Sequence, residues 1–470
     1  MEMFKNFHSF ADSIAVYSDD FSYVTYLELE AMVRDFEGFL DTSELVFILG
    51  ANDLDSLVCY LAAIRRGCVA LMLSQDLGED YLLDLASKYK PKYIWAPLNA
   101  TTNFSLSHSQ QQIFNTYNLL SSTSNLNLPS SLALLLTTSG STGNPKLIRI
   151  SKKNLEANTS SIVEALSLEA SDRVITTLPM NYSYGLSIIN THLQIGATLI
   201  MNSYPISSRE FWDYAKKTKA TSMGGVPFTY EVLSKFNSKF VSESSLKKFT
   251  QAGGKLSREK VLEIFELVDG IGGTFTVMYG QTEATARISV LPHRLIKGNP
   301  ESIGRPIPKG EIVLVDEVGE EISAPFQPGE LRYLGPNVCL GYAERLEDLY
   351  SPDNNNGSLD TGDLAYMDSD GLFFITGRKS RFVKLFGVRT SLDDIEHALS
   401  QAGFTCICQQ KNDRLLIFTT EVEMLQKIND YVKSLYKLPL TAFSTIAIKS
   451  IPRNDSGKVL YANLLEEVEA

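Results

Sequence analysis

The chain has few cysteines, and this scarcity excludes two classes of protein. Only five occur among 470 residues, and none has the spacing of a zinc site. Cys406 and Cys408 are two positions apart in an apolar stretch, so we interpret them as packed on one face of a strand. A disulfide-rich secreted domain and a cysteine-based metal centre are therefore not expected. A reducing, cytoplasmic setting fits this composition.

Long apolar runs and an excess of positive charge are also missing. No segment approaches the roughly 20 apolar residues of a membrane-spanning helix. The N-terminus lacks the basic start and apolar core of a signal peptide. Acidic residues outnumber basic residues by 55 to 43, which gives a net charge of -12, whereas a broad nucleic-acid surface needs the opposite balance. We therefore expect no membrane span and no nucleic-acid partner.

The remaining composition is that of a globular protein, with 44% hydrophobic and 21% charged residues, and the length suggests two or three domains. Strands predicted over 45–50 and 69–73 enclose a helix predicted over 54–66, an alternation typical of a parallel α/β sheet. After about residue 310 short strands alternate with turns, and a small α+β unit follows Gly377. We therefore predict an α/β fold: a large N-terminal domain with parallel α/β sheets and a β-rich section, then a small α+β domain.

The most informative segment is a loop rich in hydroxyls and glycines at residues 137–146, directly after a strand predicted over 132–136. Glycines allow a tight loop whose backbone N–H groups converge, and such a nest of donors holds anions. The hydroxyls and Lys146 add further donors and one positive charge, which suits a polyphosphate. The spacing differs from the G-x-x-x-x-G-K-[ST] pattern of P-loop NTPases. The segment is therefore predicted to be a phosphate loop of another class.

A second segment, Tyr-Gly-Gln-Thr-Glu at 279–283, follows a strand predicted over 274–278. The carboxylate of Glu283 could hold Mg²⁺, which takes one or two carboxylates together with phosphate oxygens. Thr282 could donate to a phosphate, and Tyr279 could stack on a base. The alternative for this segment alone is a turn with a solvated glutamate.

Three further segments are ambiguous when each is taken alone. Asp363, in a Thr-Gly-Asp turn, is either a turn former or an acceptor for ribose hydroxyls. Residues 377–389 concentrate basic side chains in an acidic chain, which is also the pattern of a solvated face. Residues 452–458 end in Gly457-Lys458, a lysine that would ordinarily decorate the surface.

Together, and in this order, the five segments resemble the adenylate-forming superfamily of acyl- and aryl-CoA ligases, peptide-synthetase adenylation domains and luciferases. The matching family patterns are T-S-G-[ST]-T-G-x-P-K at 138–146, Y-G-x-T-E at 279–283, T-G-D at 361–363, G-R-x-[DK]-x-x-x-K-x-x-G-x-[RQ] at 377–389 and P-x-x-x-x-G-K at 452–458. The motifs span most of the chain. The resemblance is nearest to members that are similar to acyl-CoA synthetases.

The resemblance implies an enzyme that joins a carboxylic acid to AMP, releases pyrophosphate and passes the acyl group to a thiol. It implies ATP and Mg²⁺ as cofactors and CoA as the favoured thiol, with the phosphopantetheine of a separate acyl carrier protein as the alternative. An N-terminal domain over 1–378 would bind ATP and the acid. A small, mobile C-terminal domain over 381–470 would carry the catalytic lysine. The hinge lies near Ser380, where the family usually has Asp or Lys.

The resemblance also assigns individual roles. The residues implied to bind ATP are Thr138, Ser139, Gly140, Ser141, Thr142, Gly143, Lys146, Gly253, Gly254, Tyr279, Gln281, Asp363 and Arg378. Thr282 is implied to contact the α-phosphate and Glu283 to hold Mg²⁺. Lys458 would bridge the attacking carboxylate and the α-phosphate. After the C-terminal domain rotates, Lys384 would lie on the face presented for thiol attack.

The implied acid pocket departs from the family pattern. Residues 178–185 match L-P-x-x-H-x-x-G of CoA ligases, with Tyr182 in place of His. Amino-acid-activating relatives tend to carry an Asp here, but neither Tyr182 nor Tyr184 offers a carboxylate, so with Gly225 they favour an uncharged acyl or aryl tail. The sequence leaves open the acid, the choice between CoA and carrier protein, and the oligomeric state. A non-catalytic nucleotide-binding scaffold is the remote alternative.

Overall fold

The computed structural model describes most of the chain. The described residues are 3–98, 109–112, 116–137, 146–235, 238–385, 388–411, 414–436, 442–453 and 459–466. They divide into two compact units. The first comprises the described residues within 1–312 and 333–359, and the second those within 313–332 and 360–470.

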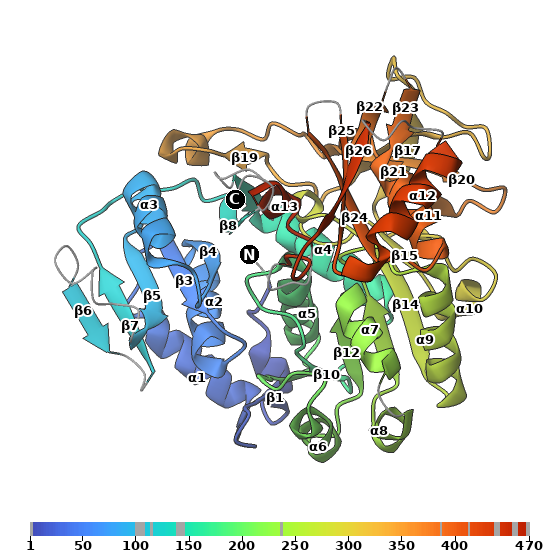
Figure 1. Ribbon diagram of the computed structural model, residues 1–470. Helices are drawn as coiled ribbons and strands as arrows, with labels where there is room; N and C mark the ends of the chain where they lie inside the picture. Colours follow the sequence, from blue (N-terminus) through green and yellow to red (C-terminus); the bar gives the residue numbers. More distant parts are fainter. Residues whose placement is uncertain are drawn as a thin grey trace. The chain divides into compact units, whose positions relative to one another are not determined.

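The first unit contains an eight-stranded sheet in the order β19-β9-β8-β4-β3-β5-β7-β6 (Figure 1). The strands are β3 (Leu45–Gly50), β4 (Val69–Ser74), β5 (Tyr93–Pro97), β6 (Ser109–Gln112), β7 (Tyr117–Ser121), β8 (Leu132–Thr137), β9 (Leu147–Ser151) and β19 (Tyr342–Ala343). Central strands β3, β4, β5 and β8 pair in parallel. Helices α2 (Leu54–Arg66) and α3 (Glu79–Tyr89) connect β3 to β4 and β4 to β5. The parallel α/β alternation predicted from the sequence is therefore confirmed.

A nine-stranded sheet, in the order β16-β15-β14-β13-β12-β10-β11-β1-β2, forms the rest of the first unit. Its strands are β1 (Ile14–Tyr17), β2 (Tyr23–Thr25), β10 (Arg173–Ile175), β11 (Thr198–Ile200), β12 (Ser222–Gly225), β13 (Lys248–Gln251), β14 (Thr274–Tyr279), β15 (Ser289–Leu291) and β16 (Arg305–Pro306). Its helices are α4 (Lys152–Ala165), α5 (Ser183–Gln194), α6 (Arg209–Lys217), α7 (Pro227–Lys235), α8 (Ser238–Glu243), α9 (Arg258–Gly270) and α10 (His293–Ile296). Because β10, β12, β13 and β14 pair in parallel, their carboxyl ends share one edge of the sheet.

Local signals explain where the helices begin and end. The sequence predicts Ser151 as the N-cap of a helix that begins at Lys152. The Ser151 side chain accepts from the backbone N–H of Asn154, which confirms it as the N-cap of α4. The Asn154 side chain in turn donates to the backbone carbonyls of Pro336 and Val338, so the helix start also holds a distant segment. Helix α2 ends at Gly67, the stop that the sequence predicts after residue 66. Gly67 adopts φ 81°, a left-handed conformation that glycine reaches without a Cβ penalty.

The Ser-, Thr-, Asn- and Gln-rich composition of residues 99–131 predicts a surface connection, and this prediction is wrong for part of its length. Strand β7 lies within it and pairs with β5 at the edge of the eight-stranded sheet. Tyr117, Leu119 and Leu120 are almost fully buried, and Tyr117 stacks on Trp95 with ring centroids 5.0 Å apart. The polar residues around this short apolar stretch masked a strand that long-range pairing stabilises.

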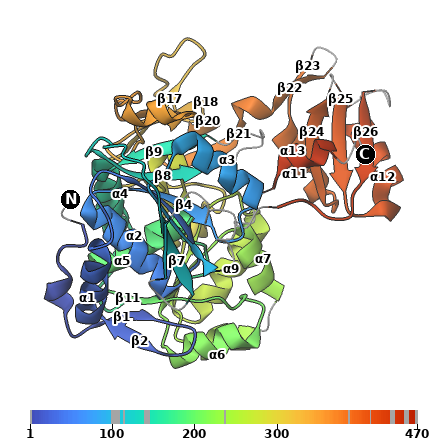
Figure 2. The same cartoon turned by 90° about the vertical axis from the view of Figure 1, so that its left-hand side faces the viewer.

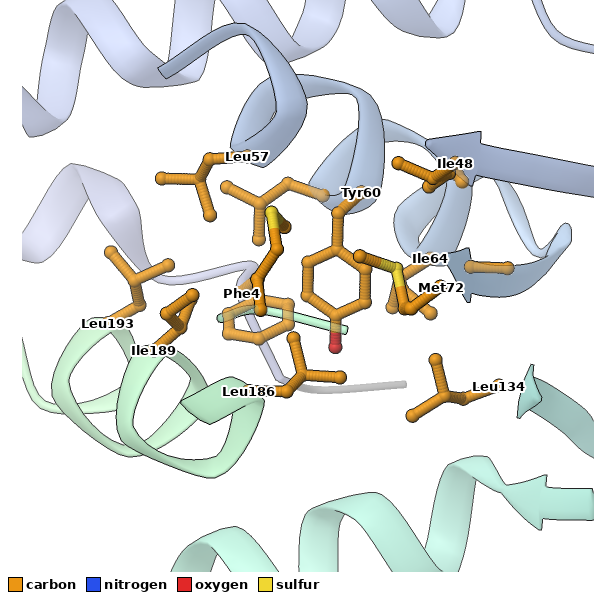
Figure 3. Close-up of a cluster of buried hydrophobic side chains, with 14 of the residues drawn as sticks. Phe4, Ile48, Leu57, Tyr60, Ile64, Met72, Leu134, Leu186, Ile189 and Leu193 are labelled. Carbon is orange, nitrogen blue, oxygen red and sulfur yellow. The ribbon is translucent and has the colours of Figure 1, made fainter. Parts of the chain in front are cut away.

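A buried cluster joins the two large sheets (Figure 3). Tyr60 of α2 lies at its centre, near Leu186 of α5 and Leu134 of β8, and its hydroxyl donates to the side-chain oxygen of Asn190 at 3.1 Å. Each buried apolar side chain contributes roughly 1.5–3 kcal/mol relative to exposure. The cluster therefore fixes the end of β8 and the start of α5 in one frame.

The second unit contains the β-rich section that the sequence predicts after residue 310. The strands of its four-stranded sheet are β17 (Glu311–Val315), β18 (Gly329–Leu334), β20 (Ser358–Met367) and β21 (Phe373–Arg378), of which Glu311, Ile312, Tyr333, Leu334, Ser358 and Leu359 belong to the first unit. A hairpin of β22 (Phe382–Leu385) and β23 (Val388–Ser391) follows.

The last elements form a three-stranded sheet flanked by helices (Figure 2). They are α11 (Leu392–Gln401), β24 (Cys406–Lys411), β25 (Arg414–Thr419), α12 (Leu425–Tyr436), β26 (Phe443–Ala447) and α13 (Tyr461–Glu466). Helices α11 and α12 pack on the face of β25 that carries Ile417, and Leu464 of α13 packs on the opposite face. Cys406 and Cys408 are buried in the cluster that α11 and α12 form with Ile417, which confirms that the two cysteines share one face of their strand.

Two structural absences bear on function. In the described parts of the chain, no helix is long and apolar enough to cross a membrane. Within the same residues, no group of three or more His, Cys, Asp and Glu side chains gathers in a way that could hold a metal ion.

Candidate nucleotide and acid site

The Tyr-Gly-Gln-Thr-Glu segment forms a tight return at the carboxyl end of β14. A Cβ on Gly280 would lie 2.0 Å from the carbonyl oxygen of Ala286, so this position excludes any side chain. The backbone N–H of Ile288 donates to the carbonyl of Tyr279 at 2.9 Å and closes the loop. The loop thus presents residues 281–283 at the sheet edge in a fixed conformation.

Thr282 and Glu283 have separate partners within this loop. The hydroxyl oxygens of Thr282 and Ser183 are 3.1 Å apart, which joins the loop to the start of α5. The Tyr342 hydroxyl donates to the Glu283 carboxylate at 2.9 Å, and burial together with this carboxylate raises the pKa of Tyr342. The half-buried carboxylate fits Mg²⁺, which takes few protein ligands and completes its shell with phosphate oxygens and water.

Lys146 lies beside the same tyrosine. Strand β19 pairs with β9 through Tyr342 and Ile148, two residues beyond Lys146. The Lys146 ammonium is 5.7 Å from the Tyr342 ring centroid and 2.7 Å from the Glu344 carboxylate. Because this ion pair is about half exposed, it contributes little and leaves the lysine available to a more strongly charged ligand. Lys146, Tyr342 and Glu283 thus gather at one place.

The predicted base-binding residues lie at adjacent strand ends. Gly253 and Gly254 follow β13, and Tyr279 ends the neighbouring parallel strand β14. Gly253 adopts φ +86°, and a Cβ there would lie 2.5 Å from the Tyr182 hydroxyl. The Gln281 side-chain amide donates to the Tyr279 hydroxyl at 3.3 Å. The four predicted positions therefore share the carboxyl edge of the sheet.

The predicted acid-pocket residues meet this edge through Tyr182 at the N-cap of α5. Burial raises the pKa of Tyr182 to about 12, so its hydroxyl stays protonated near neutral pH. The Tyr184 hydroxyl lies 2.7 Å from the Thr250 hydroxyl and donates to the Thr250 carbonyl at 2.9 Å. Gly225 ends β12 nearby in the sheet, but its missing Cβ faces Tyr230 and Thr229.

Arg287, which the sequence analysis does not single out, lies beside the predicted acid-pocket residue Tyr184. It is 2% exposed, and its guanidinium lies 4.5 Å from the Tyr184 ring centroid. Burial lowers the pKa of this guanidinium, and its Nε has no hydrogen-bond partner within the described chain. A signal was present in the sequence, because Arg287 stands four residues after Glu283 in an otherwise small and apolar stretch.

Asp363 and Arg378 face each other in the second unit, in register across β20 and β21. The Arg378 Nε donates to the Asp363 carboxylate at 2.8 Å. The Asp363 side chain is 3% exposed, whereas that of Arg378 is 57% exposed. The two residues are fifteen positions apart in sequence, and both are predicted to bind ATP. The pairing of β20 with β21 brings their side chains together.

The other predicted positions are described in part or not at all. Ser380 lies in the 3₁₀ turn Lys379–Arg381, and Lys384 lies in β22 in register with Arg389. The phosphate-loop residues Thr138, Ser139, Gly140, Ser141, Thr142 and Gly143 fall outside the described residues, as does Lys458.

Comparison with known proteins identifies related chains. A long-chain-fatty-acid–CoA ligase of Bacillus subtilis is 30% identical over 277 residues, which cover 57% of this chain and 48% of that protein. An oxalate–CoA ligase of Arabidopsis thaliana is 27% identical over 393 residues, which cover 76% and 73%. The chain therefore spans about half the length of the first ligase that it matches.

Solved structures and a family match complete the comparison. ATP-bound MatB from Rhodopseudomonas palustris aligns with a TM-score of 0.77 at 21% identity, over 99% of this chain and 98% of that one, which confirms the α/β fold. The family described as AMP-binding enzyme matches residues 3–343. Because that match covers well over half of the chain, the protein belongs to the AMP-binding enzyme family, and the resemblance carried by its motifs is confirmed.

Proposed function

We propose that this protein activates a carboxylic acid with ATP and Mg²⁺, releases pyrophosphate and transfers the acyl group to the thiol of CoA. The observation that carries the proposal is the gathering of Lys146, Tyr342 and Glu283 at the end of β14. A flexible cation and a half-buried carboxylate at one strand edge suit a nucleotide triphosphate with its metal. Membership of the AMP-binding family supports the same reading.

In the first step a carboxylate oxygen of the acid attacks the α-phosphorus, and the bond to the leaving pyrophosphate breaks. When bound, Mg²⁺ would offset the negative charge of the phosphates. Thr282 would donate a hydrogen bond from its hydroxyl to the α-phosphate, and Glu283 would hold the metal. Lys146 exchanges its weak pairing with Glu344 for the phosphates of the leaving group. These residues position reactants and stabilise charge.

The same proposal gives the base and ribose contacts. Tyr279 stacks on adenine, with the Gly253-Gly254 turn on the other side of the ring. Asp363 accepts from the ribose hydroxyls, and Arg378 orients its carboxylate through the 2.8 Å hydrogen bond. A carboxylate that accepts ribose hydroxyls is a common device in nucleotide sites.

We further propose that residues 381–470 act as a domain that turns about Ser380. Lys458 would then enter the site for adenylation and Lys384 for thiol transfer. Replacement of Lys458 by alanine should abolish pyrophosphate exchange yet leave transfer from supplied acyl-adenylate intact. Loss of both steps, or of neither, would contradict this role.

CoA is the proposed acceptor because two related chains of different acid specificity are both named as CoA ligases. Their acids, a long-chain fatty acid and oxalate, differ so much that neither can be transferred to this chain. The phosphopantetheine of a separate carrier protein is the competing acceptor. The cytoplasmic location of the protein stays a prediction.

The test is acid-dependent ATP–pyrophosphate exchange over short, long, aryl, hydroxy, dicarboxylic and amino acids, followed by addition of CoA to each active mixture. We expect one acid class to support exchange and CoA to convert it to a thioester. Exchange with no thioester would favour a carrier protein. A folded protein that binds ATP but supports no exchange with any acid would contradict the proposal and favour a nucleotide-binding scaffold.

A further inference from the structure

Arg287 is a buried cation for which the described chain supplies no anion. It is 2% exposed, and no hydrogen bond or ion pair from its guanidinium exists within the described residues. The glycine-rich loop at 138–145, which lies outside those residues, contains no acidic side chain. Burial of an unpaired charge is costly, so a protein keeps one only where a partner arrives or a ring offsets it.

A second buried arginine, Arg149, shows how this fold satisfies a guanidinium that has a purely structural role. Arg149 is 0% exposed, and its guanidinium donates to the backbone carbonyls of Leu340, Tyr342, Ser351 and Pro352 at 2.6–3.2 Å. Every nitrogen of that guanidinium has a protein acceptor. Arg287 has instead one aromatic face, that of Tyr184, which offsets only part of the lost hydration.

The backbone of Arg287 is held firmly. The side-chain amides of Asn158 and Asn337 both donate to its carbonyl, at 3.2 Å and 3.0 Å. The Tyr184 ring is also fixed, since its hydroxyl is bound to Thr250 and a Cβ on Gly224 would lie 2.9 Å from it. The guanidinium therefore has a defined position, as a preorganised binding group requires.

Three consecutive residues connect this cation to the reacting end of the site. Tyr182 contacts the Gly253 turn, Ser183 contacts Thr282, and Tyr184 contacts Arg287. If the acid's carboxylate meets the α-phosphate near Thr282, then Arg287 lies along the wall that receives the rest of the acid. This placement of the acid's carboxylate near Thr282 rests on the proposed function.

We infer that the acid activated by this protein carries a second anionic group, such as a second carboxylate, and that Arg287 binds it. A guanidinium presents paired N–H donors that match a carboxylate, and the low-polarity surroundings strengthen the pairing. Arg287 is thus a specificity-determining residue. The inference departs from the uncharged tail that Tyr182 and Tyr184 led us to expect from the sequence.

The test compares dicarboxylic acids with monocarboxylic acids of the same chain length in ATP–pyrophosphate exchange. The wild-type protein should prefer the dicarboxylic acid by about 100-fold or more in kcat/KM, because the monocarboxylic acid leaves the buried cation unpaired. Arg287→Met should remove that preference and leave the KM for ATP unchanged. Arg294→Met, at an exposed arginine of α10, is the matched control and should behave as wild type.

The outcomes separate the two proposals. Exchange with no acid at all would overturn the proposed function. Exchange with monocarboxylic acids, at rates equal to or above those with dicarboxylic acids, would overturn the second-anion inference alone. The wild-type comparison decides this even if Arg287→Met fails to fold, and Arg287→Lys, which keeps the charge, should retain part of the preference.

Discussion

Arg149 and Arg287 are both almost fully buried, yet we propose that Arg149 serves the framework and Arg287 the site. The Arg149 guanidinium ties β9 to the segment around residues 340–352 through four carbonyls. Arg287 ends against the Tyr184 ring with its Nε unpartnered within the described chain. Burial alone therefore says little about the role of a charged residue, and the set of partners decides it.

A third arginine, Arg381, shows a guanidinium that is paired with carboxylates. Its side chain is 12% exposed and pairs with Asp393 and Glu396 of α11. The Arg381 guanidinium also lies 4.3 Å from the Tyr461 ring centroid, so it combines two carboxylates with a ring. Within the described chain, Arg287 has a ring without a carboxylate. Of the three guanidinium groups, we infer that only that of Arg287 has N–H donors available to a ligand. Substitutions at these residues and at the proposed metal ligand can test this difference.

The largest expected effect is on the framework arginine. Arg149→Met should lower the free energy of unfolding by about 3–5 kcal/mol, because four carbonyls lose their donor in a buried setting. Urea denaturation followed by circular dichroism measures this. A loss below about 1 kcal/mol would mean that solvent replaces the donor and that the contrast with Arg287 is overstated.

The next effect concerns the proposed metal ligand. Glu283→Gln should raise the Mg²⁺ concentration needed for half-maximal pyrophosphate exchange by about 10- to 100-fold, with little change in stability. Glu344→Gln, which removes the carboxylate paired with Lys146, is the control and should leave the Mg²⁺ requirement unchanged. An unchanged Mg²⁺ titration for Glu283→Gln would remove this residue from the metal site.

Stability should respond in the opposite direction at Arg287. Arg287→Met should leave the free energy of unfolding unchanged or raise it by about 1 kcal/mol, since the substitution removes an unpaired buried charge. Thermal unfolding of the unliganded protein, beside wild type and Arg294→Met, provides the measurement. Destabilisation comparable to that of Arg149→Met would show that Arg287 is a structural residue.

The smallest effect is a pH dependence in the second unit. Burial raises the pKa of Glu396 to about 7, although Arg381 opposes the shift. A carboxyl group with a raised pKa binds a proton in the folded state that the unfolded state has lost. Stability should therefore fall as pH rises from about 4.5 to about 7. Glu396→Gln should flatten this part of the pH profile, and an identical profile in the variant would contradict the assignment.

Much of the fold could be predicted from the sequence. The alternation of strands and helices, the stop at Gly67 and the cap at Ser151 are local features, and the structure confirms them. Strand β7 was missed because its pairing with β5 depends on contacts across the chain. The local sequence pattern does not reveal stabilisation that comes from long-range strand pairing.

The candidate site also has features that the sequence predicts and features that only the structure reveals. Motifs identified Glu283 and Lys146, but their meeting at Tyr342 depends on the pairing of β19 with β9, almost two hundred residues apart in sequence. Arg287 follows a motif closely and still escaped notice. We propose a role for it because its Nε has no partner within the described residues, and such a missing partner becomes visible only when the surrounding side chains are placed.

The most direct test of the account is the kcat/KM ratio for a dicarboxylic and a monocarboxylic acid of equal length, measured by pyrophosphate exchange in wild type and Arg287→Met. We predict a ratio of about 100 or more in wild type and a ratio near one in the variant, with an unchanged KM for ATP. An equal ratio in the two proteins, or a wild-type preference for the monocarboxylic acid, would contradict the central claim that Arg287 awaits a second anion.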